Sequence, residues 1–173
     1  MMLLSGKRVF LRELAASDRA ELLRLARSSR KLHRPWVAPL IDSKAFGKLL
    51  QRTKGDRFAT LLICERETGA IAGLINISEI VKGTFCSAYL GYYVHAAFSG
   101  RGYMTEGMRL ACRYAFTKLG LHRLEANIQP TNLASIHLAT RCGFRKEGFS
   151  PRYIKVGGRW RDHERWAITR EDS

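Results

Sequence analysis

The segment from Phe98 to Gly102 combines the residues of this sequence that are best suited to bind an anion. Gly100 and Gly102 lie between a strand-like run and an apolar helical pattern. Glycines at the start of a helix let backbone N–H groups approach an anion closely, and the helix dipole favours negative charge there. Arg101 adds a cation and Thr105 a hydroxyl. These features predict a phosphate or pyrophosphate site; an ordinary strand-to-helix turn with two glycines is the alternative.

Two other kinds of ligand site are disfavoured by residue spacing. The turn lacks the third glycine of a dinucleotide fingerprint, and no GxxxxGK[ST] phosphate loop occurs in the chain. The four cysteines (Cys64, Cys86, Cys112 and Cys142) form no CxxC pair, and the five histidines form no pair at ligand spacing. We therefore expect no metal site, and we expect buried free thiols of the kind found in a reducing compartment.

Apolar periodicity predicts the elements that position this turn. Strand-like runs cover residues 8–14, 58–64, 70–80, 87–94, 123–128, 144–153 and 160–168. Helical patterns follow Asp18 (with Glu21 as a capping box), follow Asp42 or Ser43, run from Tyr103 to Leu119 and run from Pro130 to Cys142. Residues 35–39 are expected to form a loop.

The strand–helix–strand passage from Ser87 to Ile128 decides the topology. Two strands joined through a helix are expected to be parallel neighbours in one sheet. Short turns such as Gly157-Gly158 join other strands and predict antiparallel hairpins. No linker or repeat interrupts the chain. The sequence therefore predicts one domain over residues 1–173, of α/β (α+β) class, with a mixed and mostly antiparallel sheet.

The net charge indicates a class of partner. Thirty Lys and Arg residues against fifteen Asp and Glu residues give a formal charge of +15. Such a charge attracts polyanions, including nucleic acid, the ribosome and anionic cofactors. The cations gather toward both ends of the chain, at Arg24, Arg27, Arg30, Lys31 and Arg34, and at Arg141, Arg145, Lys146, Arg152, Lys155, Arg159 and Arg161. A solvated basic surface and a dedicated RNA contact both remain open, because no aromatic-interleaved motif accompanies these residues.

Neither a membrane span nor a secretion signal is expected. No apolar stretch approaches the roughly 20 residues that cross a bilayer. The opening segment from Met1 to Leu4 is too short for a signal-peptide core. The sequence therefore predicts a cytoplasmic enzyme without membrane contact.

In its wider context the turn resembles the cofactor turn of the GNAT superfamily of acetyltransferases. That turn follows Q/R-x-x-G-x-G/A, which falls on Ser99 to Met104; Gly102 matches, whereas Ser99 and Met104 depart from the pattern. Longer stretches are similar to the branch that contains bacterial ribosomal-protein-alanine N-acetyltransferases. They are Leu90 to Val94, Gly100 to Glu106, Asn132-x-x-Ser135, Cys142 to Phe149 and Gly158 to His163. The resemblance covers nearly the whole chain and is thinnest over residues 30 to 57.

The resemblance implies a GNAT-like fold that binds acetyl-CoA. Such folds splay two parallel strands, here within 89–94 and 124–128, between flanking helices, and pantetheine lies along the exposed strand edge. The implied contacts are the backbone of Tyr93 and Val94 with pantetheine, the turn Ser99, Gly100, Arg101, Gly102, Tyr103, Met104 and Thr105 with the pyrophosphate, Asn132 with the cofactor, and Ser135 with the thioester sulfur. A plain helix N-cap is the alternative for Asn132, and a small residue that admits the cofactor is the alternative for Ser135.

The chemistry that the resemblance implies is acyl transfer from a thioester to an amine, which needs a neutral amine, a stabilised oxyanion and a leaving thiolate. Ser135 is the candidate for protonating or bonding the sulfur, because Ala139 stands where many family members carry a tyrosine. Glu79, at the end of a strand, is the candidate base, and Glu125 is a second candidate. The backbone N–H of Val94 is a candidate oxyanion donor.

Three functions fit these observations. The first is acetylation of the N-terminal α-amino group of a protein, a ribosomal protein in particular, with the basic surface aiding docking near rRNA. The second is acetylation of a small amine such as an antibiotic, a polyamine or an amino acid; the shortage of carboxylates disfavours polycationic acceptors. The third is a non-catalytic ribosome- or RNA-binding factor of the same fold, which the missing tyrosine keeps open.

Overall fold

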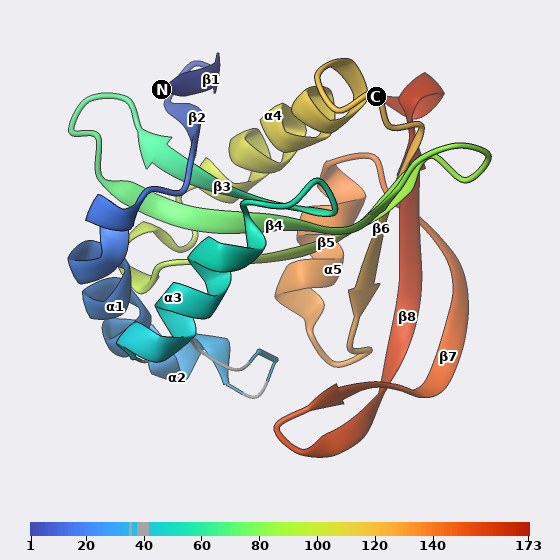
Figure 1. Cartoon of the computed structure of the whole chain (residues 1–173). Helices are drawn as coiled ribbons and strands as arrows, with labels where there is room; N and C mark the ends of the chain where they lie inside the picture. Colours follow the sequence, from blue (N-terminus) through green and yellow to red (C-terminus); the bar gives the residue numbers. More distant parts are fainter. Residues whose placement is uncertain (35, 38–41) are drawn as a thin grey trace.

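An eight-stranded sheet forms the centre of the molecule (Figure 1). The computed structural model describes residues 1–34, 36–37 and 42–173, and these strands belong to that part of the chain. In chain order they are β1 (Met2–Ser5), β2 (Val9–Glu13), β3 (Phe58–Glu65), β4 (Ile71–Val81), β5 (Ser87–Val94), β6 (Arg123–Ile128), β7 (Arg145–Val156) and β8 (Arg159–Thr169). Their spatial order is β1-β2-β3-β4-β5-β6-β8-β7, and every neighbouring pair except β5–β6 is antiparallel. The predicted mixed, mostly antiparallel sheet is confirmed.

The parallel pair, β5 and β6, is joined over only part of its length. Its register runs from Ser87 opposite Arg123 to Tyr89 opposite Glu125 and ends there. β5 remains paired with β4 as far as Val94, and β6 remains paired with β8 along its whole length. The two strands therefore diverge beyond Tyr89 while each keeps its other neighbour. This divergence opens the middle of the sheet, and α5 lies beside the opening (Figure 1).

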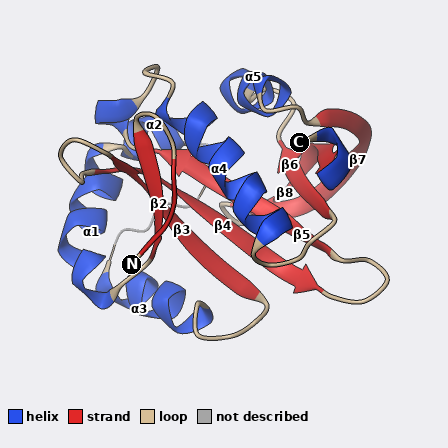
Figure 2. Cartoon of the chain, turned by 90° about the horizontal axis from the view of Figure 1, so that it is seen from above, coloured by secondary structure: helices blue, strands red, loops and turns tan. Residues whose placement is uncertain are grey.

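Helices cover both faces of the sheet (Figure 2). They are α1 (Arg19–Ser28), α2 (Arg30–His33), α3 (Ser43–Arg52), α4 (Tyr103–Thr117) and α5 (Leu133–Arg141). α1 and α3 bury Leu22 and Phe46 against one face. α4 buries Met108, Ala111 and Ala115 against the other, at the spacing of one helix face. No helix in the described ranges is long and apolar enough to cross a membrane.

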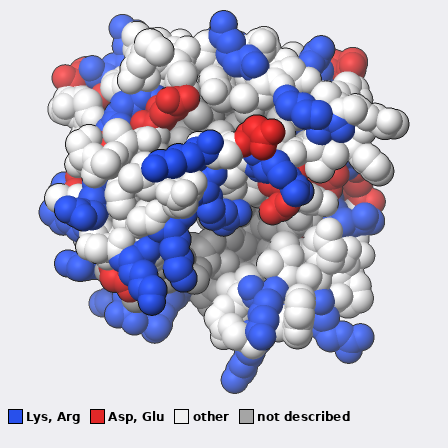
Figure 3. Space-filling model, viewed as in Figure 1, with Lys and Arg blue, Asp and Glu red and all other residues white. Residues whose placement is uncertain are grey.

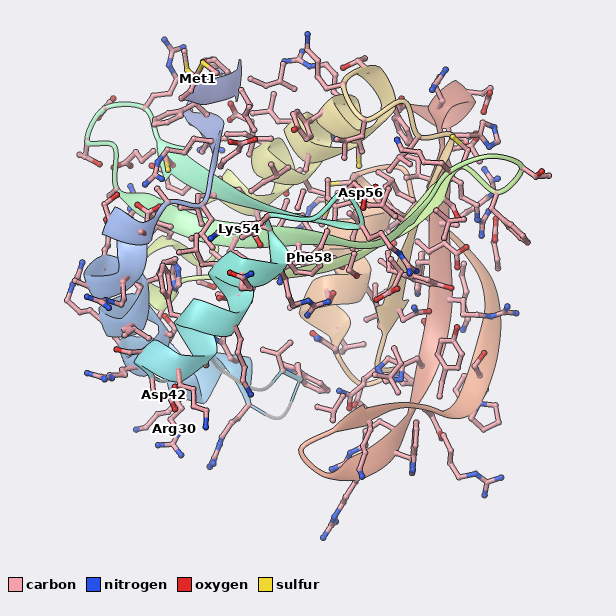
Figure 4. All side chains as sticks on the ribbon, in the orientation of Figure 1. Met1, Arg30, Asp42, Lys54, Asp56 and Phe58 are labelled. Carbon is pink, nitrogen blue, oxygen red and sulfur yellow. The ribbon has the colours of Figure 1, made fainter. Side chains whose placement is uncertain are left out.

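Two of these helices begin at side-chain caps. Asp42, at the start of α3 (Figure 4), accepts a hydrogen bond from the Ala45 N–H at 2.8 Å. Asn132 precedes α5 and accepts from the Ser135 N–H at 3.2 Å. Each cap pairs a first-turn N–H that has no partner within the helix. The cap at Asn132 also fixes where Ser135 stands, which matters for the site below.

The structure differs from the sequence prediction in the first 42 residues. Asp18 and Glu21 do not form a capping box: Asp18 binds Arg12 through two contacts of 2.8 Å, and Glu21 accepts from the Ile71 N–H at 3.1 Å. Asp18 also accepts from the Ala15 N–H at 2.8 Å, so partners outside α1 replace the expected cap. β1 and α2 were not predicted, because four-residue elements are too short to show a periodic pattern. The loop expected at 35–39 lies mostly outside the described residues.

Candidate active site

A cavity of about 570 Å³ borders the end of β5, where β5 is paired with β4 but no longer with β6. Its walls come from α2 with the following Trp36 and Val37, from the end of β5, and from the turn before α4 together with α5. The predicted site residues that line it are Tyr93, Val94, Ser99, Gly100, Gly102, Met104, Thr105, Asn132 and Ser135. The fold therefore brings most of the predicted site together in one place. None of the described lining residues is Asp or Glu.

The end of β5 presents backbone groups to the opening in the sheet. The His95 N–H donates to the Ala72 carbonyl at 2.8 Å, so this residue directs its backbone toward β4. Because successive residues of a strand alternate, Tyr93 does the same, whereas Tyr92 and Val94 direct their backbone groups toward the side that β6 has left. The backbone of Tyr93 therefore pairs with β4, which differs from its expected contact with pantetheine.

The turn before α4 meets the cavity through open backbone. Gly100 and Gly102 have φ values of 74° and 79°, a conformation that glycine adopts without strain. Gly102 is the N-cap of α4. A Cβ built on Gly100 would have no atom within 4 Å, so the space beside it is open. A helix N-terminus with open backbone at a cavity is the arrangement that phosphate binding requires.

Arg8 and Val9, at the start of β2, fix the position of this turn. Glu106, in the first turn of α4, accepts from the Arg8 N–H at 2.8 Å and from the Val9 N–H at 3.4 Å. Arg8 also donates through Nη1 to the Arg101 carbonyl at 2.9 Å. Burial raises the pKa of Glu106, but the hydrogen bonds from Arg8 and Val9 outweigh it and lower the pKa below its usual value. The turn is therefore fixed by contacts with a distant strand.

Arg101 and Tyr103 lie outside the cavity, which differs from their predicted role. The Arg101 guanidinium lies 3.8 Å from the Glu65 carboxylate and donates to the Tyr103 hydroxyl at 3.2 Å. Tyr103 in turn donates to Glu65. The hydrogen bonds from Tyr103 and Thr68 lower the pKa of Glu65. The arginine that lines the cavity is Arg141, at the end of α5.

One face of α5 lines the cavity. Its N-cap Asn132 and the helix residues Ser135, Leu138 and Arg141 are all lining residues. Sequence reasoning did not single out Arg141 as a site residue. The Ser135 hydroxyl lies 2.7 Å from the hydroxyl of Tyr92, which reaches it from β5. Burial raises the pKa of Tyr92 to about 12, so Tyr92 keeps its proton at neutral pH.

The α2 side of the cavity is aromatic. His33 bonds through Nε2 to the Val94 carbonyl at 2.7 Å, and its ring centroid lies 4.8 Å from that of Tyr93. His95 lies behind them, fully buried, and neither of its ring nitrogens has a hydrogen-bond partner among the described residues. Burial lowers the pKa of His95 to about 4. Sequence reasoning missed this wall because the short α2 gave no signal.

The two carboxylates predicted as bases lie away from the cavity. Glu79 occupies an irregular part of β4 with a φ of 49°, and its side chain is 58% exposed and pairs with Arg57 at 3.2 Å. Glu125 accepts from Arg123 Nε at 2.9 Å. Neither is a lining residue. The structure therefore does not bring Glu79 or Glu125 to Ser135.

Comparison with known families agrees with this geometry. A family model described as an acetyltransferase (GNAT) domain matches residues 8–145, from just before β2 to the start of β7. The chain belongs to the GNAT family of acetyltransferases. The predicted family, and the predicted acetyltransferase activity with it, are confirmed.

Relatives of this acetyltransferase include both sequences and solved structures. It is 31% identical over 178 residues to the probable N-acetyltransferase YjcK of Bacillus subtilis, with 98% of each chain covered. It is 40% identical over 102 residues to the [ribosomal protein uS5]-alanine N-acetyltransferase of Escherichia coli, which covers 59% of this chain and 53% of that one. Mycobacterium smegmatis RimJ in complex with CoA-disulfide has a TM-score of 0.84 at 30% identity, over 94% of this chain and 82% of that one.

The cavity fits coenzyme A on its own features. A helix N-terminus with open backbone at Gly100 suits a pyrophosphate, and Arg141 supplies a cation. The Val94 N–H and the backbone of Tyr92, which face the side that β6 has left, suit an amide-bearing chain. Acetyl-CoA supplies the acyl group, activated as a thioester. Within the described ranges no three His, Cys, Asp or Glu side chains gather into a metal site.

Proposed function

We propose that this enzyme acetylates the N-terminal α-amino group of a protein, a ribosomal protein in particular. The observation that carries the proposal is the absence of Asp and Glu from the described lining of the cavity. The α2 wall offers Leu32, His33, Trp36 and Val37, which suit a small apolar side chain. A polyamine would place further ammonium groups there without partners, and unpaired buried charge is costly. A peptide N-terminus carries a single amine followed by a neutral backbone.

The acidity of the acceptor supports the same proposal. An α-amino group has a pKa of roughly 7.7–8.0, so a fraction on the order of a tenth is already neutral at pH 7. A lysine side chain, with a pKa of about 10.4, would need a strong base to reach the same state. No described carboxylate lines the cavity. In this proposal the amine proton leaves to water, and neither Glu79 nor Glu125 touches the acceptor.

The remaining roles follow the placement of the side chains. The backbone of the turn from Ser99 to Thr105 holds the pyrophosphate, with the side chains of Arg101 and Tyr103 bracing the turn from outside. Asn132 both caps α5 and faces the cofactor. Ser135 stands beside the thioester sulfur. The Val94 N–H, directed at the opening, donates to the oxyanion as the amine attacks.

Positive charge on the surface supports an acceptor that sits on RNA. Figure 3 shows Lys and Arg over the α1–α3 side and over the β7–β8 hairpin. Exposed cations in these two regions include Arg24, Arg30, Lys31 and Arg34, and Arg152, Lys155 and Arg159. We expect this charge to speed approach to rRNA and to make binding salt-dependent. A ribosomal acceptor also makes the cytoplasm the compartment in which we expect the reaction.

An acceptor panel tests the proposal. Release of free thiol from acetyl-CoA is measured with peptides that begin with Ala, Ser or Met and with a set of small amines. Spermidine belongs in this set, because the spermidine N(1)-acetyltransferase of Escherichia coli is 26% identical to this chain over 134 residues. We expect turnover with Ala or Ser peptides. Turnover confined to small amines would contradict the proposal, and salt-sensitive RNA binding without any turnover would favour a non-catalytic factor.

A further inference from the structure

Tyr92 and Ser135 meet at the cavity as a hydrogen-bonded pair, with 2.7 Å between their hydroxyl oxygens. Tyr92 comes from the part of β5 beyond the parallel pairing, and Ser135 comes from the first turn of α5. Both line the cavity. The pair therefore joins the two elements that border the opening in the sheet, and it forms only when both are in place.

The position of Ser135 is fixed through its backbone, but the direction of its hydroxyl hydrogen is set only by its neighbours. The Asn132 cap holds its backbone N–H at 3.2 Å. A serine hydroxyl carries one hydrogen and two acceptor lone pairs, and its hydrogen rotates to suit its neighbours. When Tyr92 donates to the Ser135 oxygen, the Ser135 hydrogen is left for a second acceptor. Ala139, one turn further along α5, is buried and has no hydroxyl that would compete.

Tyr92 is the better donor of the two. A phenol is more acidic than an aliphatic hydroxyl, and burial raises the pKa of Tyr92 only to about 12. The phenol therefore stays protonated over the whole working range and always has a hydrogen to donate. A chain of two hydrogen bonds polarises each member, so the Ser135 hydroxyl becomes a stronger donor than it would be alone.

We propose that Tyr92 is a positioning residue for acyl transfer: it donates to Ser135, and Ser135 donates to the sulfur of the departing coenzyme A. This inference rests on the proposed function, which places the thioester sulfur beside Ser135. During transfer the amine nitrogen bonds to the carbonyl carbon, the C–S bond breaks and its electron pair goes to sulfur. The amine proton leaves to water, and the thiolate takes a proton from water.

The pair stabilises the thiolate without giving up the Tyr92 proton. An ordinary thiol has a pKa of about 8.5, well below that of this phenol, so a thiolate is too weak a base to deprotonate Tyr92. Its negative charge is instead shared through two hydrogen bonds. The expected consequence is a bound coenzyme A thiol that ionises more readily in the native enzyme than in a variant without the pair.

The ionisation of bound coenzyme A tests this directly and needs no acceptor. The ultraviolet absorbance of the thiolate is followed against pH in the binary complex of coenzyme A with the native enzyme and with Tyr92→Phe, Ser135→Ala and the double variant. We expect the thiol pKa to rise by about one unit in Ser135→Ala, because this variant loses one hydrogen bond to a charged group. The rise should be smaller in Tyr92→Phe, where Ser135 keeps a weaker bond to the sulfur, and the double variant should rise no further than Ser135→Ala. A native thiol pKa in Tyr92→Phe would overturn the proposal.

Steady-state kinetics provide the second readout. We expect Ser135→Ala to lower kcat roughly tenfold and Tyr92→Phe to lower it a few-fold, while the KM for acetyl-CoA stays within about threefold in both, since the pair acts on the leaving group. Tyr114→Phe is the matched control: Tyr114 belongs to α4, packs against the core and does not line the cavity, so its variant should keep native kinetics. Melting temperatures show whether each variant folds.

Failure of the inference and failure of the proposed function are distinguishable. Native enzyme that acetylates a peptide, with unchanged thiol pKa and kcat in Tyr92→Phe, overturns only the role of Tyr92. Native enzyme that binds coenzyme A and acetylates no α-amine overturns the proposed function, while a raised thiol pKa in Tyr92→Phe would still support the pair.

Discussion

Replacing Gly100 by alanine adds one methyl group where the turn before α4 meets the cavity. Gly100 has a φ of 74°, a region that costs an L-residue about 1–2 kcal/mol. The new Cβ would have no protein atom within 4 Å, so the folded chain accommodates it. Gly69→Ala is a matched control, because Gly69 has a φ of 73°, is equally open and lies in the β3–β4 turn outside the cavity. Both variants should lose about 1–2 kcal/mol of unfolding free energy.

The two variants should differ in their affinity for coenzyme A. A backbone N–H holds a phosphate oxygen at about 2.9 Å, and a methyl group needs about 3.5–4 Å from its neighbours. The methyl group of Gly100→Ala therefore pushes the pyrophosphate away from the turn. Loss of one hydrogen bond to a charged group, worth about 1.5–3 kcal/mol, raises the Kd roughly tenfold to a hundredfold. Gly69→Ala should keep the native Kd.

Calorimetric titration with coenzyme A measures the Kd, and denaturant unfolding of the same samples measures stability. Pantetheine, which lacks the pyrophosphate, is the control ligand and should bind Gly100→Ala and the native enzyme alike. If Gly100→Ala binds coenzyme A as tightly as Gly69→Ala does, the pyrophosphate does not lie against this turn, and the placement of the cofactor is refuted.

Three further predictions concern charge. Arg141→Gln should weaken coenzyme A binding about tenfold at low salt. Arg101→Gln should leave binding near native, because the Arg101 guanidinium faces Glu65. Equal effects of the two variants in calorimetry would contradict these side-chain orientations. Glu106→Gln should lower unfolding free energy at pH 7 by about 1 kcal/mol. Because the pKa of Glu106 is lowered in the fold, the difference in stability between the native enzyme and the variant should shrink as pH falls below about 4.3. A difference that stays constant with pH in urea unfolding would argue against the bonds to Arg8 and Val9. The pKa of His95 falls from 6.5 to about 4 on folding, so its contribution to native stability should decline by up to about 3 kcal/mol as pH falls through this window. His95→Leu should remove this part of the decline, and parallel stability curves for the two proteins would refute the prediction.

The turn and the strands beside it were predictable because their signals are local. The run 87–94 and the run 123–128 have the same bounds as β5 and β6, and the βαβ rule gives their parallel pairing. Asp42 caps α3 as its residue type and position indicate. Gly100 and Gly102 adopt the positive φ values that explain why glycine stands there. The positions of Asn132 and Ser135 follow from the start of α5, which Asn132 caps.

Side-chain direction depended on partners that are distant in sequence. The Arg101 side chain points to Glu65 on β3, and no local sequence pattern predicts this contact. Glu79 was expected at the cleft, but an irregularity in β4 turns it to Arg57. His33 lies in a helix of four residues, too short to show periodicity. The family resemblance implied the divergence of β5 and β6, but the bond between the Tyr92 and Ser135 hydroxyls depends on side-chain directions that only the folded chain displays.

The central claim is that the cavity at the end of β5 transfers acetyl from acetyl-CoA to an N-terminal α-amine. The most direct test uses one peptide that begins with Ala and carries an internal lysine, incubated with acetyl-CoA and the native enzyme and sequenced by fragment mass spectrometry. We predict a single acetyl group on the α-amine of the first residue. Acetylation of the lysine alone, or an unmodified peptide beside acetylated spermidine in the same tube, would contradict the claim.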